Sequence, residues 1–420
     1  MKIAFLTQEV PEINDLGGIG FHFWGLAQEL VRQGHQVSVF FDGDSRVLKN
    51  GVELIGVWSK SVRRPSLLNR ISALGNSHEL LKTCAWGLQA SLVLDTFQKS
   101  QPFDIIETHE YHATPFLLLK NAERCVLSIH GGKEQTARLN LDFGGFSHRV
   151  LALLERQTVR GAQHRYAVSR LQARLATANY SVPISTVIPN SIDTKLFCPL
   201  IEPTASQKIH SPHPSSFCLF VGRMEHRKGI GILLKSYAAL IQRFGSTIPD
   251  LICIGGDFHH LGRTRNLSLV EYLALPEQKL IRKKVHYFKH RTHSELAQYY
   301  RHAVCSIFPS LGEPFGNVVA EALSCGSIVI ATKTSGVSQW LRDGKDALLI
   351  SPTIDELSLA IERVLPARKK SARVLSMSSI RSMKESARLT AMKYFSQEVV
   401  ANNTLRYYKQ VLKEIKRKNA

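Results

Sequence analysis

The chain has 420 residues, of which 44% are hydrophobic and 21% charged. This composition excludes a disordered or collagen-like chain, and the length suggests two or three domains. The longest apolar runs, such as LICIG, are far shorter than the ~20 residues of a membrane span. The N-terminal MKIAFLTQEV is too short for a signal-peptide core and reads as a strand. We therefore expect a cytoplasmic protein.

Positive charge is concentrated at the C-terminal end. The net charge is +20, and residues 361–420 hold 15 basic and 4 acidic residues, a net of +11. Such a segment suits an anionic membrane, an acidic polymer or nucleic acid, or is simply a solvated helix face. Nucleic acid is the weakest option, because no zinc-finger, ribonucleoprotein or basic-zipper pattern is present. The seven cysteines form no C-x-x-C pair, so we expect buried, reduced thiols.

In the first half of the chain, short apolar strands alternate with helical patterns. A strand is expected at 2–7, followed by a glycine-rich turn and a helix at about 21–32. The further strands are expected at 36–41, 104–107, 126–130, 166–169 and 185–189. This alternation is typical of a parallel sheet with helices on both faces.

The alternation pauses at 199–216, where four Pro and four Ser indicate a linker, and then restarts. Strands are expected at 217–222, 251–256, 285–288, 305–310, 327–331 and 347–350, and helices at 228–243, 294–302 and 316–325. We therefore expect two doubly wound α/β domains in tandem. Their expected bounds are 1–198 for the first domain, 199–216 for the linker, 217–390 for the second domain and 391–420 for a basic final helix.

Ligands of open parallel sheets bind outside the carboxyl ends of the strands, so clusters that directly follow strands are informative. The first cluster, Gly17–Gly20, suits close approach of a ligand to a helix N-terminus, although a plain tight turn is an equal alternative. The second, 221–229, places Arg223 and Lys228 before a helix. A planar guanidinium, an ammonium and free amides together favour phosphate binding over two solvated cations.

The third cluster, 313–321, follows a strand and contains the start of a helix. Glu313 lies in the loop, Gly316 leaves the helix amides open to a phosphate, and Glu321 lies within the helix. Carboxylates accept hydrogen bonds from vicinal hydroxyls, so a sugar and a ribose are plausible partners. The fourth cluster ends a strand with His130-Gly131-Gly132, and we expect the imidazole to point into a cleft. Glu107–Glu110 follows another strand, and this position alone suggests that it lines the same cleft.

Two other groups are discounted. The D-x-D string at 42–44 follows a strand without further carboxylates, so a turn is more probable than a metal site. Histidines 259, 260, 286, 290 and 293 lie in loops or at changing spacing. The sequence therefore indicates no metal site.

Several of these strings resemble one known group. They are GGIG after the first strand, SIHGG, VIPNSID at 187–193, GR-x4-KG, and the E-x7-E string EPFGNVVAEAL. Together they are similar to the retaining nucleotide-sugar glycosyltransferases of family 4 (glycosyl transferases group 1). The resemblance implies the GT-B fold, in which two Rossmann-like domains face each other across a cleft and a C-terminal helix crosses back to the first.

The resemblance also implies roles for residues of the second domain. Arg223 and Lys228 would hold the donor diphosphate and stabilise its departure. Glu313 would contact the donor sugar hydroxyls and Glu321 the donor ribose. The remaining implied contacts are the amides of Gly316, Asn317 and Val318 to phosphate or sugar oxygens. In the first domain, His130 would touch the donor sugar near its reacting carbon, and the loop with Gly18 and Gly20 would close against phosphates or the acceptor.

The implied reaction moves a sugar, with retention, from a UDP-, GDP- or ADP-sugar to a hydroxyl acceptor. The acceptor is a glycan, a lipid-linked sugar or a small metabolite, and neither a prosthetic group nor a divalent metal is needed. One alternative is a nucleotide-sugar epimerase, with Glu107 and Glu110 as its acid and base. Another is a nucleotide-sugar-binding protein without catalysis. Arg63-Arg64, the stretch 67–94 and the basic end favour peripheral attachment to the inner face of a membrane.

Overall fold

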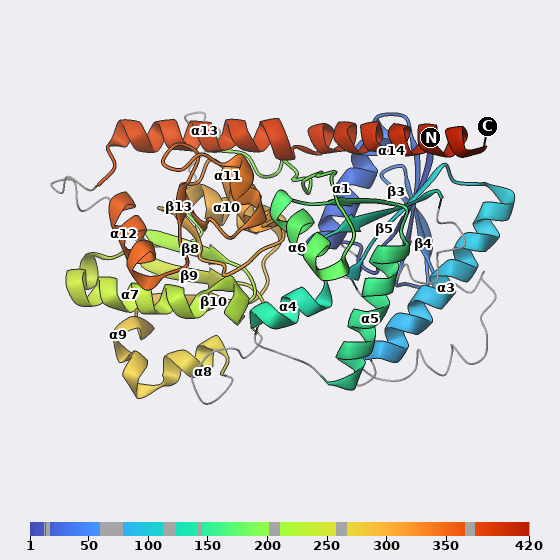
Figure 1. The fold of residues 1–420 in the computed structure, drawn as a ribbon. Helices are drawn as coiled ribbons and strands as arrows, with labels where there is room; N and C mark the ends of the chain where they lie inside the picture. The colour runs from blue at the N-terminus through green and yellow to red at the C-terminus, as the bar shows by residue number, and fades with distance from the viewer. Residues whose placement is uncertain are drawn as a thin grey trace. The chain divides into compact units, whose positions relative to one another are not determined.

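The computed structural model describes residues 1–11, 13, 17–58, 79–111, 123–140, 145–200, 211–257, 267–365 and 374–419. The chain forms two compact units (Figure 1). The first comprises Met1–Arg138, Asp142–Ser191 and Gln397–Ala420, and the second Leu139–Leu141 and Ile192–Ser396. Arg63, Arg64, residues 67–78 of the expected amphipathic stretch, residues 201–210 of the expected linker, and the 259–260 histidine pair lie outside the described residues.

The first unit is built on a seven-stranded sheet of order β3-β4-β2-β1-β5-β6-β7. Its strands are β1 (Lys2–Leu6), β2 (Gln36–Phe41), β3 (Arg46–Lys49), β4 (Val52–Gly56), β5 (Ile105–His109), β6 (Cys125–Ile129) and β7 (His164–Ala167). All neighbours pair in parallel except β3 and β4. Without β3, the order is the 3-2-1-4-5-6 arrangement of doubly wound folds. Successive strands are first added on one side of β1 and then, from β5 on, on its other side.

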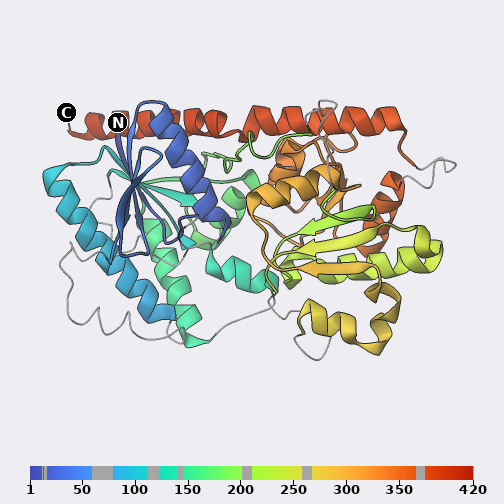
Figure 2. The same ribbon diagram turned by 180° about the vertical axis from the view of Figure 1, so that it is seen from behind.

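Both faces of this sheet are covered by helices because its buried strands are apolar on both sides. In β1, Ile3 and Phe5 pack toward α1 (Gly18–Arg32) and α14 (Gln397–Asn419). The alternate residues Ala4 and Leu6 pack toward α3 (Glu79–Ser100). The helices α5 (Phe146–Gly161) and α6 (Arg170–Tyr180) complete this second layer beside β6 and β7 (Figures 1 and 2).

Three sequence expectations for the first unit need correction. The hairpin β3–β4 was not expected, and its turn is formed by Asn50 and Gly51, both at positive φ. The expected strand at 185–189 is not formed: Val187 makes one isolated bridge to Ala167. Proline 189 cannot donate to a strand ladder, which limits the pairing there. Cys84 is exposed on α3, whereas Cys125, Cys218, Cys253, Cys305 and Cys325 are buried and free.

The second unit has a six-stranded, entirely parallel sheet of order β10-β9-β8-β11-β12-β13. The strands are β8 (Phe217–Val221), β9 (Asp250–Ile254), β10 (Val285–Phe288), β11 (Ser306–Phe308), β12 (Val329–Thr332) and β13 (Leu348–Ile350). This order is again 3-2-1-4-5-6, with the reversal between β8 and β11. The loops after β8 and β11 therefore lie at the place where such folds bind ligands.

Helices sandwich this sheet as well. The helices α7 (Ile230–Phe244), α8 (Leu269–Ala274), α9 (Lys279–Arg282) and α12 (Ile354–Val364) share one apolar cluster with the strands. On the other side lie α10 (His293–His302), α11 (Asn317–Ser324) and α13 (Met377–Phe395), with α11 packed against both α10 and α13 (Figure 1). No helix of the described residues is long and apolar enough to cross a membrane.

The final helix α14 is held to the first unit by a buried carboxylate. Its apolar face, including Val400, Tyr408 and Ile415, packs into the core of that unit. The hydroxyls of Tyr408 and Tyr166 both donate to the fully buried carboxylate of Glu107, the latter at 2.6 Å. Burial raises the pKa of Glu107 to about 7, although the hydrogen bonds from these tyrosines oppose the rise.

This carboxylate makes the stability of the first unit depend on pH. The folded state holds the Glu107 proton more tightly than the unfolded state, whose pKa is near 4.5. Raising the pH through the interval from 4.5 to 7 therefore destabilises the fold, by up to a few kcal/mol for one such group. We expect the urea midpoint to fall between pH 5.5 and 8, and Glu107→Gln to make this decline shallower without abolishing it, because Glu110 also has a raised pKa. Glu398→Gln, at an exposed position of α14, should leave the decline unchanged. An equally steep decline in Glu107→Gln would contradict this assignment.

Candidate active site

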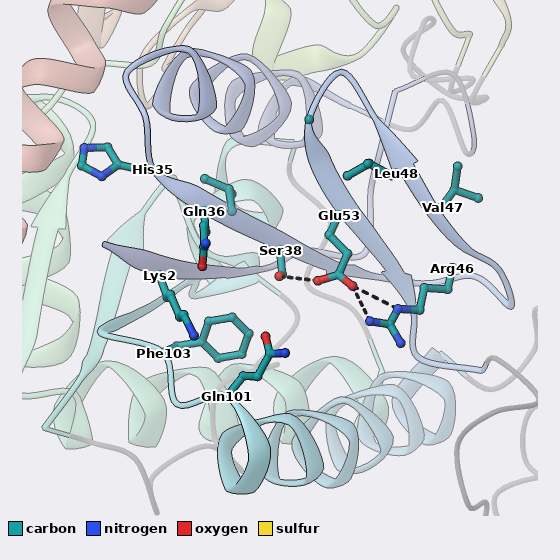
Figure 3. A pocket seen from close by; sticks show the side chains of 12 residues that line it. Lys2, His35, Gln36, Ser38, Arg46, Val47, Leu48, Glu53, Gln101 and Phe103 are labelled. Atoms are coloured by element: carbon teal, nitrogen blue, oxygen red, sulfur yellow. Dashed lines mark hydrogen bonds and ion pairs between the residues drawn. The ribbon is translucent and has the colours of Figure 1, made fainter.

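One surface depression of the described residues lies away from the candidate site. It has a volume of about 620 Å³ and lies at the amino ends of β1 and β2, beside the β3–β4 hairpin (Figure 3). Across it, Glu53 accepts hydrogen bonds from Ser38 and Arg46. Doubly wound sheets bind ligands at the opposite, carboxyl ends of their strands, where the clusters predicted from sequence lie.

In the second unit, the loops after β8 and β11 pack directly on each other. The loop after β8 forms a short 3-10 turn, His226–Lys228, and Gly229 then begins α7 in the left-handed conformation, with φ 73°. A Cβ on Gly229 would lie 2.0 Å from the carbonyl oxygen of Pro309, which follows β11. Only glycine therefore allows this close approach, and the approach brings Lys228 to the loop that holds Glu313.

Lys228 and Glu313 belong to a cluster of three cations and two carboxylates. Glu313 Oε2 lies 2.5 Å from Lys228 Nζ and 3.0 Å from Arg227 Nη1. The Arg227 Nη2 atom lies 2.8 Å from Glu225 Oε1, which is also 3.1 Å from Arg223 Nη2. The cluster therefore has one more positive than negative charge. The side chain of Arg223 is 44% exposed, so this excess charge is accessible to an anion.

Electrostatics within the cluster keep Glu313 ionised. Burial alone would raise its pKa, but the charges of Lys228 and Arg227, a hydrogen bond from Lys228 and the charge of Arg223 hold the pKa at about 2. Burial lowers the pKa of Lys228, and the charge of Glu313 opposes that effect. Because the carboxylate stays negative, it fixes the two cations beside it in place.

A helix N-terminus adjoins this cluster. Gly316 precedes α11 at φ 108°, and a Cβ there would lie 2.9 Å from Ser335 Oγ, so the turn requires glycine. Asn317 and Val318 are the first two residues of the helix, and its first turn has no acidic side chain. The first amides of a helix carry partial positive charge and lack intrahelical acceptors. The start of α11 can therefore add hydrogen bonds to an anion held by Arg223 and Lys228.

Glu321 lies one turn further into α11 and is buried. Its Oε2 atom accepts a hydrogen bond of 3.0 Å from the hydroxyl of Tyr300. Burial raises its pKa, while the charge of His293, the Tyr300 hydroxyl and the charge of Lys228 oppose the rise. The carboxylate of Glu321 is thus close enough to Lys228 to be affected by its charge, and the structure brings both predicted glutamates to one region of the second unit.

In the first unit, the glycine-rich turn is occupied by the chain's own carboxylate. The helix α1 begins at Gly18, earlier than the expected residue 21. The amide of Gly20 donates to Glu9 Oε2 at 3.2 Å, and a Cβ on Gly20 would lie 2.7 Å from Glu9 Cβ. A phosphate at this helix N-terminus would meet the negative charge of Glu9. Hydroxyl groups are therefore better partners for this loop than phosphates.

His130 is held by a second buried carboxylate. Glu110 follows β5 and accepts hydrogen bonds from the amides of His130, at 2.8 Å, and Gly131, at 2.6 Å. Burial and the charge of Glu155 raise the pKa of Glu110 to about 8, although these backbone hydrogen bonds oppose the rise. The loop after β6 is thus anchored to the loop after β5, and the orientation of His130 depends on Glu110.

Two histidines of this unit have defined tautomers. Ser128 Oγ donates to the Thr108 carbonyl, so it accepts from His130 Nε2, 3.1 Å away. The amide of Ser191 donates to His22 Nδ1 at 3.1 Å, so His22 carries its hydrogen on Nε2. The centroids of the two rings lie 5.5 Å apart. Burial lowers the pKa of His22 to about 3 and places that of His130 well below its usual value, so both are neutral.

The two remaining ring atoms can serve a ligand. His130 Nδ1 is a bare acceptor and His22 Nε2–H is a donor, and both are buried without a hydrogen-bond partner among the residues that the structure describes. Buried polar atoms without partners are costly, so bound hydroxyl groups would relieve this cost. A hydroxyl accepts one hydrogen bond and donates another, which matches this pair.

Sequence reasoning missed four residues of these clusters: Glu9, His22, Glu225 and Arg227. Glu225 and Arg227 lie inside the 221–229 string, in which the sequence predicts phosphate contacts for Arg223 and Lys228. His22 lies two residues after the glycine-rich turn, on the buried face of α1. Its partner Ser191 is 169 residues away, so the pairing has no local signal.

Comparisons with known proteins agree with this architecture. The family profile of "Glycosyltransferase Family 4" matches residues 16–196, and that of "Glycosyl transferases group 1" matches residues 202–377. D-inositol 3-phosphate glycosyltransferase of Corynebacterium urealyticum is 26% identical over 373 residues, which cover 83% of this chain and 84% of that protein.

Solved structures show the same fold at lower sequence identity. Sucrose-phosphate synthase of Thermosynechococcus elongatus superposes with a TM-score of 0.71 at 18% identity, covering 98% of this chain and 99% of its own. HepE of Anabaena in complex with UDP-glucose gives a TM-score of 0.63 at 17% identity, covering 99% of each chain. The two parallel-sheet units thus have the GT-B architecture. The two profiles together extend over most of the sequence, and the chain belongs to the family 4 glycosyltransferases, glycosyl transferases group 1.

Proposed function

We propose that this glycosyltransferase uses a nucleotide-diphosphate sugar and transfers the sugar to a hydroxyl acceptor with retention. The cation cluster around Glu313, next to the start of α11, carries this proposal. A leaving nucleoside diphosphate develops negative charge that must be stabilised. Two arginines, one lysine and a helix N-terminus supply positive charge for this purpose, so no divalent cation is required.

Each site residue has a role in this proposal. Arg223 and Lys228 bind the diphosphate, and the amides of Gly316, Asn317 and Val318 complete its coordination. Glu313 accepts from hydroxyls of the donor sugar while it fixes Lys228, and Glu321 accepts from the ribose hydroxyls. In the first unit, the His22–His130 pair binds a sugar hydroxyl, and the loop with Gly18 and Gly20 meets the acceptor.

The proposed reaction needs no separate general base, because the leaving phosphate accepts the proton of the acceptor. The acceptor oxygen attacks the anomeric carbon from the face that the phosphate leaves. The carbon–oxygen bond to the β-phosphate breaks, and the departing phosphate oxygen takes the acceptor proton. The neutral imidazole of His130 cannot supply charge, so its role is to orient the sugar. The products are a nucleoside diphosphate and a glycoside with the donor's anomeric configuration.

The epimerase alternative is disfavoured by the carboxylates that it would use. Glu107 and Glu110 are both fully buried. Glu107 is bound by two tyrosine hydroxyls and Glu110 by two backbone amides. Neither side chain is therefore available for proton exchange with a sugar carbon. A binding protein without catalysis would also need cations for the phosphates, so turnover of the donor is the measurement that separates it from the proposed transferase.

The proposal is tested by nucleotide release from UDP-, GDP- and ADP-sugars in the presence of chelator. UDP-sugars come first, since HepE was crystallised with UDP and glucose. The acceptor panel includes D-inositol 3-phosphate, after the names of the relatives, together with glycans and lipid-linked sugars. We expect one donor to be turned over with chelator present, and the product's anomeric configuration, read by NMR, to match the donor's. Inversion, or a requirement for added metal, would contradict the proposed mechanism.

A second part of the proposal concerns the acceptor's location. The outer faces of α3 and α5, which lie side by side, expose Leu88 (38%), Phe146 (79%) and Leu153 (56%) (Figure 1). Arg149 and Arg156 are also exposed on α5. Apolar side chains among arginines suit the interface of an anionic bilayer. The exposed basic face of α14 adds positive charge to the same unit.

Vesicle binding checks this attachment. We expect the protein to co-sediment with phosphatidylglycerol-containing vesicles at low salt and to be released at high salt. The double variant Phe146→Ser and Leu153→Ser should weaken binding more than about tenfold, because each side chain loses apolar burial of at least ~1.4 kcal/mol. Leu389→Ser, at an exposed leucine of α13 in the other unit, is the matched control. Equal binding by both variants would contradict this surface.

A further inference from the structure

The amino end of the second unit's sheet holds two imidazoles and a carboxylate that the proposed transfer does not use. Asp250 is the first residue of β9, His286 belongs to β10, and His213 lies shortly before β8. These three strands are neighbours in a parallel sheet, so their amino ends meet at one edge. One candidate ligand atom from each side chain lies within 4.8 Å of the other two.

The geometry of the first two groups fits a metal ion. His286 Nε2 and Asp250 Oδ2 lie 3.3 Å apart. Ligand atoms of a tetrahedral zinc site are also separated by about 3.3 Å, because each metal–ligand bond is about 2.0–2.1 Å long. The Asp250 side chain is only 12% exposed, and Lys284 Nζ binds its other oxygen, Oδ1, at 3.0 Å. The ion pair thus orients the carboxylate and leaves Oδ2 next to the imidazole.

His213 completes the set from the segment that precedes β8. Its ring centroid lies 5.0 Å from that of His286. Its Nδ1 atom lies 3.3 Å from the carbonyl oxygen of Ser215 and 3.2 Å from the Ser215 amide nitrogen. Metal binding at Nε2 requires the tautomer in which Nδ1–H donates to the carbonyl oxygen. Metal-binding histidines usually donate their second ring N–H to such a carbonyl, which fixes the tautomer. The side chain is partly exposed, so it can rotate to close the remaining distance.

We propose that His213, Asp250 and His286 bind one divalent transition-metal ion of the zinc class. Two imidazoles and one carboxylate are ligands that zinc accepts, with water in the fourth position. The ion would tie the segment that enters β8 to β9 and to the edge strand β10. This site is structural, because it lies at the amino ends of the strands, whereas Arg223 follows the carboxyl end of β8. Its occupancy is therefore independent of the proposed sugar transfer.

Zinc titration of the full chain tests the site. Metal is first removed with chelator, and zinc affinity is measured by competition with a chromophoric chelator. We expect one tight zinc per chain, and His213→Ala and His286→Ala should each weaken it more than about tenfold. His290→Ala, at an exposed histidine just after β10, is the matched control and should bind as the original chain does. Circular dichroism verifies that the variants fold. We expect His213→Ala to fold, because His213 precedes β8 and lies outside the apolar core.

X-ray absorption on the zinc-loaded chain supplies a second readout. The proposal requires a first coordination sphere of nitrogen and oxygen, whereas zinc on the exposed Cys84 would show sulfur. Zinc should also slow hydrogen exchange in β10. Three results would each overturn the site. They are equal zinc affinity of His213→Ala and His290→Ala, a coordination sphere dominated by sulfur, and the absence of tight zinc binding. The cluster would then be only the Lys284–Asp250–His286 hydrogen-bond network.

Discussion

Lys228→Met is expected to lower kcat/KM for nucleoside diphosphate release about 10²–10³-fold. The substitution keeps the apolar stem of the side chain and removes the charge that meets the leaving phosphate. Losing one preorganised charge or donor at the place where negative charge develops has an effect of this size in other enzymes. Arg227 still pairs with Glu313 in the variant, so the loop keeps its main anchor.

The measurement is steady-state release of nucleotide, with the donor and acceptor identified in the substrate panel. Lys235→Met is the matched control, because Lys235 is an exposed lysine on α7, the helix that follows this loop. It should retain the original kcat/KM within about twofold. If Lys228→Met turns over donor as fast as Lys235→Met does, the role of Lys228 is wrong.

Glu313→Ala is expected to destabilise the second unit by about 3–5 kcal/mol. Removing one partner of a buried ion pair leaves the other uncompensated, and here both Lys228 and Arg227 lose their shared carboxylate. Glu134→Ala removes an exposed pair with Arg138 and should cost at most about 1 kcal/mol. Urea denaturation of the two variants measures the difference.

The pH dependence of this effect identifies its cause. The folded-state pKa of Glu313 is about 2, below its ordinary value of 4.5. Its stabilisation is therefore fully present above about pH 5 and is lost as the pH falls from 4.5 toward 2. The stability gap between the original chain and Glu313→Ala should narrow over that range. If the difference in unfolding free energy between the two chains stays constant down to pH 3, the destabilisation by Glu313→Ala comes from lost packing and not from lost charge.

Much of the fold could be predicted because strand ends carry a strong local pattern. Both sheets follow from short apolar strands alternating with helices, and the clusters after β8 and β11 follow from their residue types and their position after strands. The β3–β4 hairpin also had a signal, since an Asn-Gly pair such as Asn50-Gly51 is typical of a two-residue turn. The segment 185–189 has a strand-like composition, but it bridges β7 at only one residue.

The partners of the candidate site residues could not be predicted, because they come from distant parts of the chain. Arg227 and Glu313 are 86 residues apart. Glu9 looks like an ordinary surface residue of a loop, yet it binds the amide of Gly20. A single sequence contains the residue types of such pairs but no information on which distant segments the topology brings together.

Calorimetric titration with UDP, GDP and ADP in chelator tests the central claim, that the cation cluster of the second unit binds the donor diphosphate. We expect one of these nucleotides to bind the original chain with a single site and to bind Lys235→Met equally well. Lys228→Met should bind it at least about tenfold more weakly, because a charge-assisted contact to phosphate contributes about 1.5–3 kcal/mol. Equal affinity for Lys228→Met and Lys235→Met, or no binding of any of the three nucleotides, would contradict the claim.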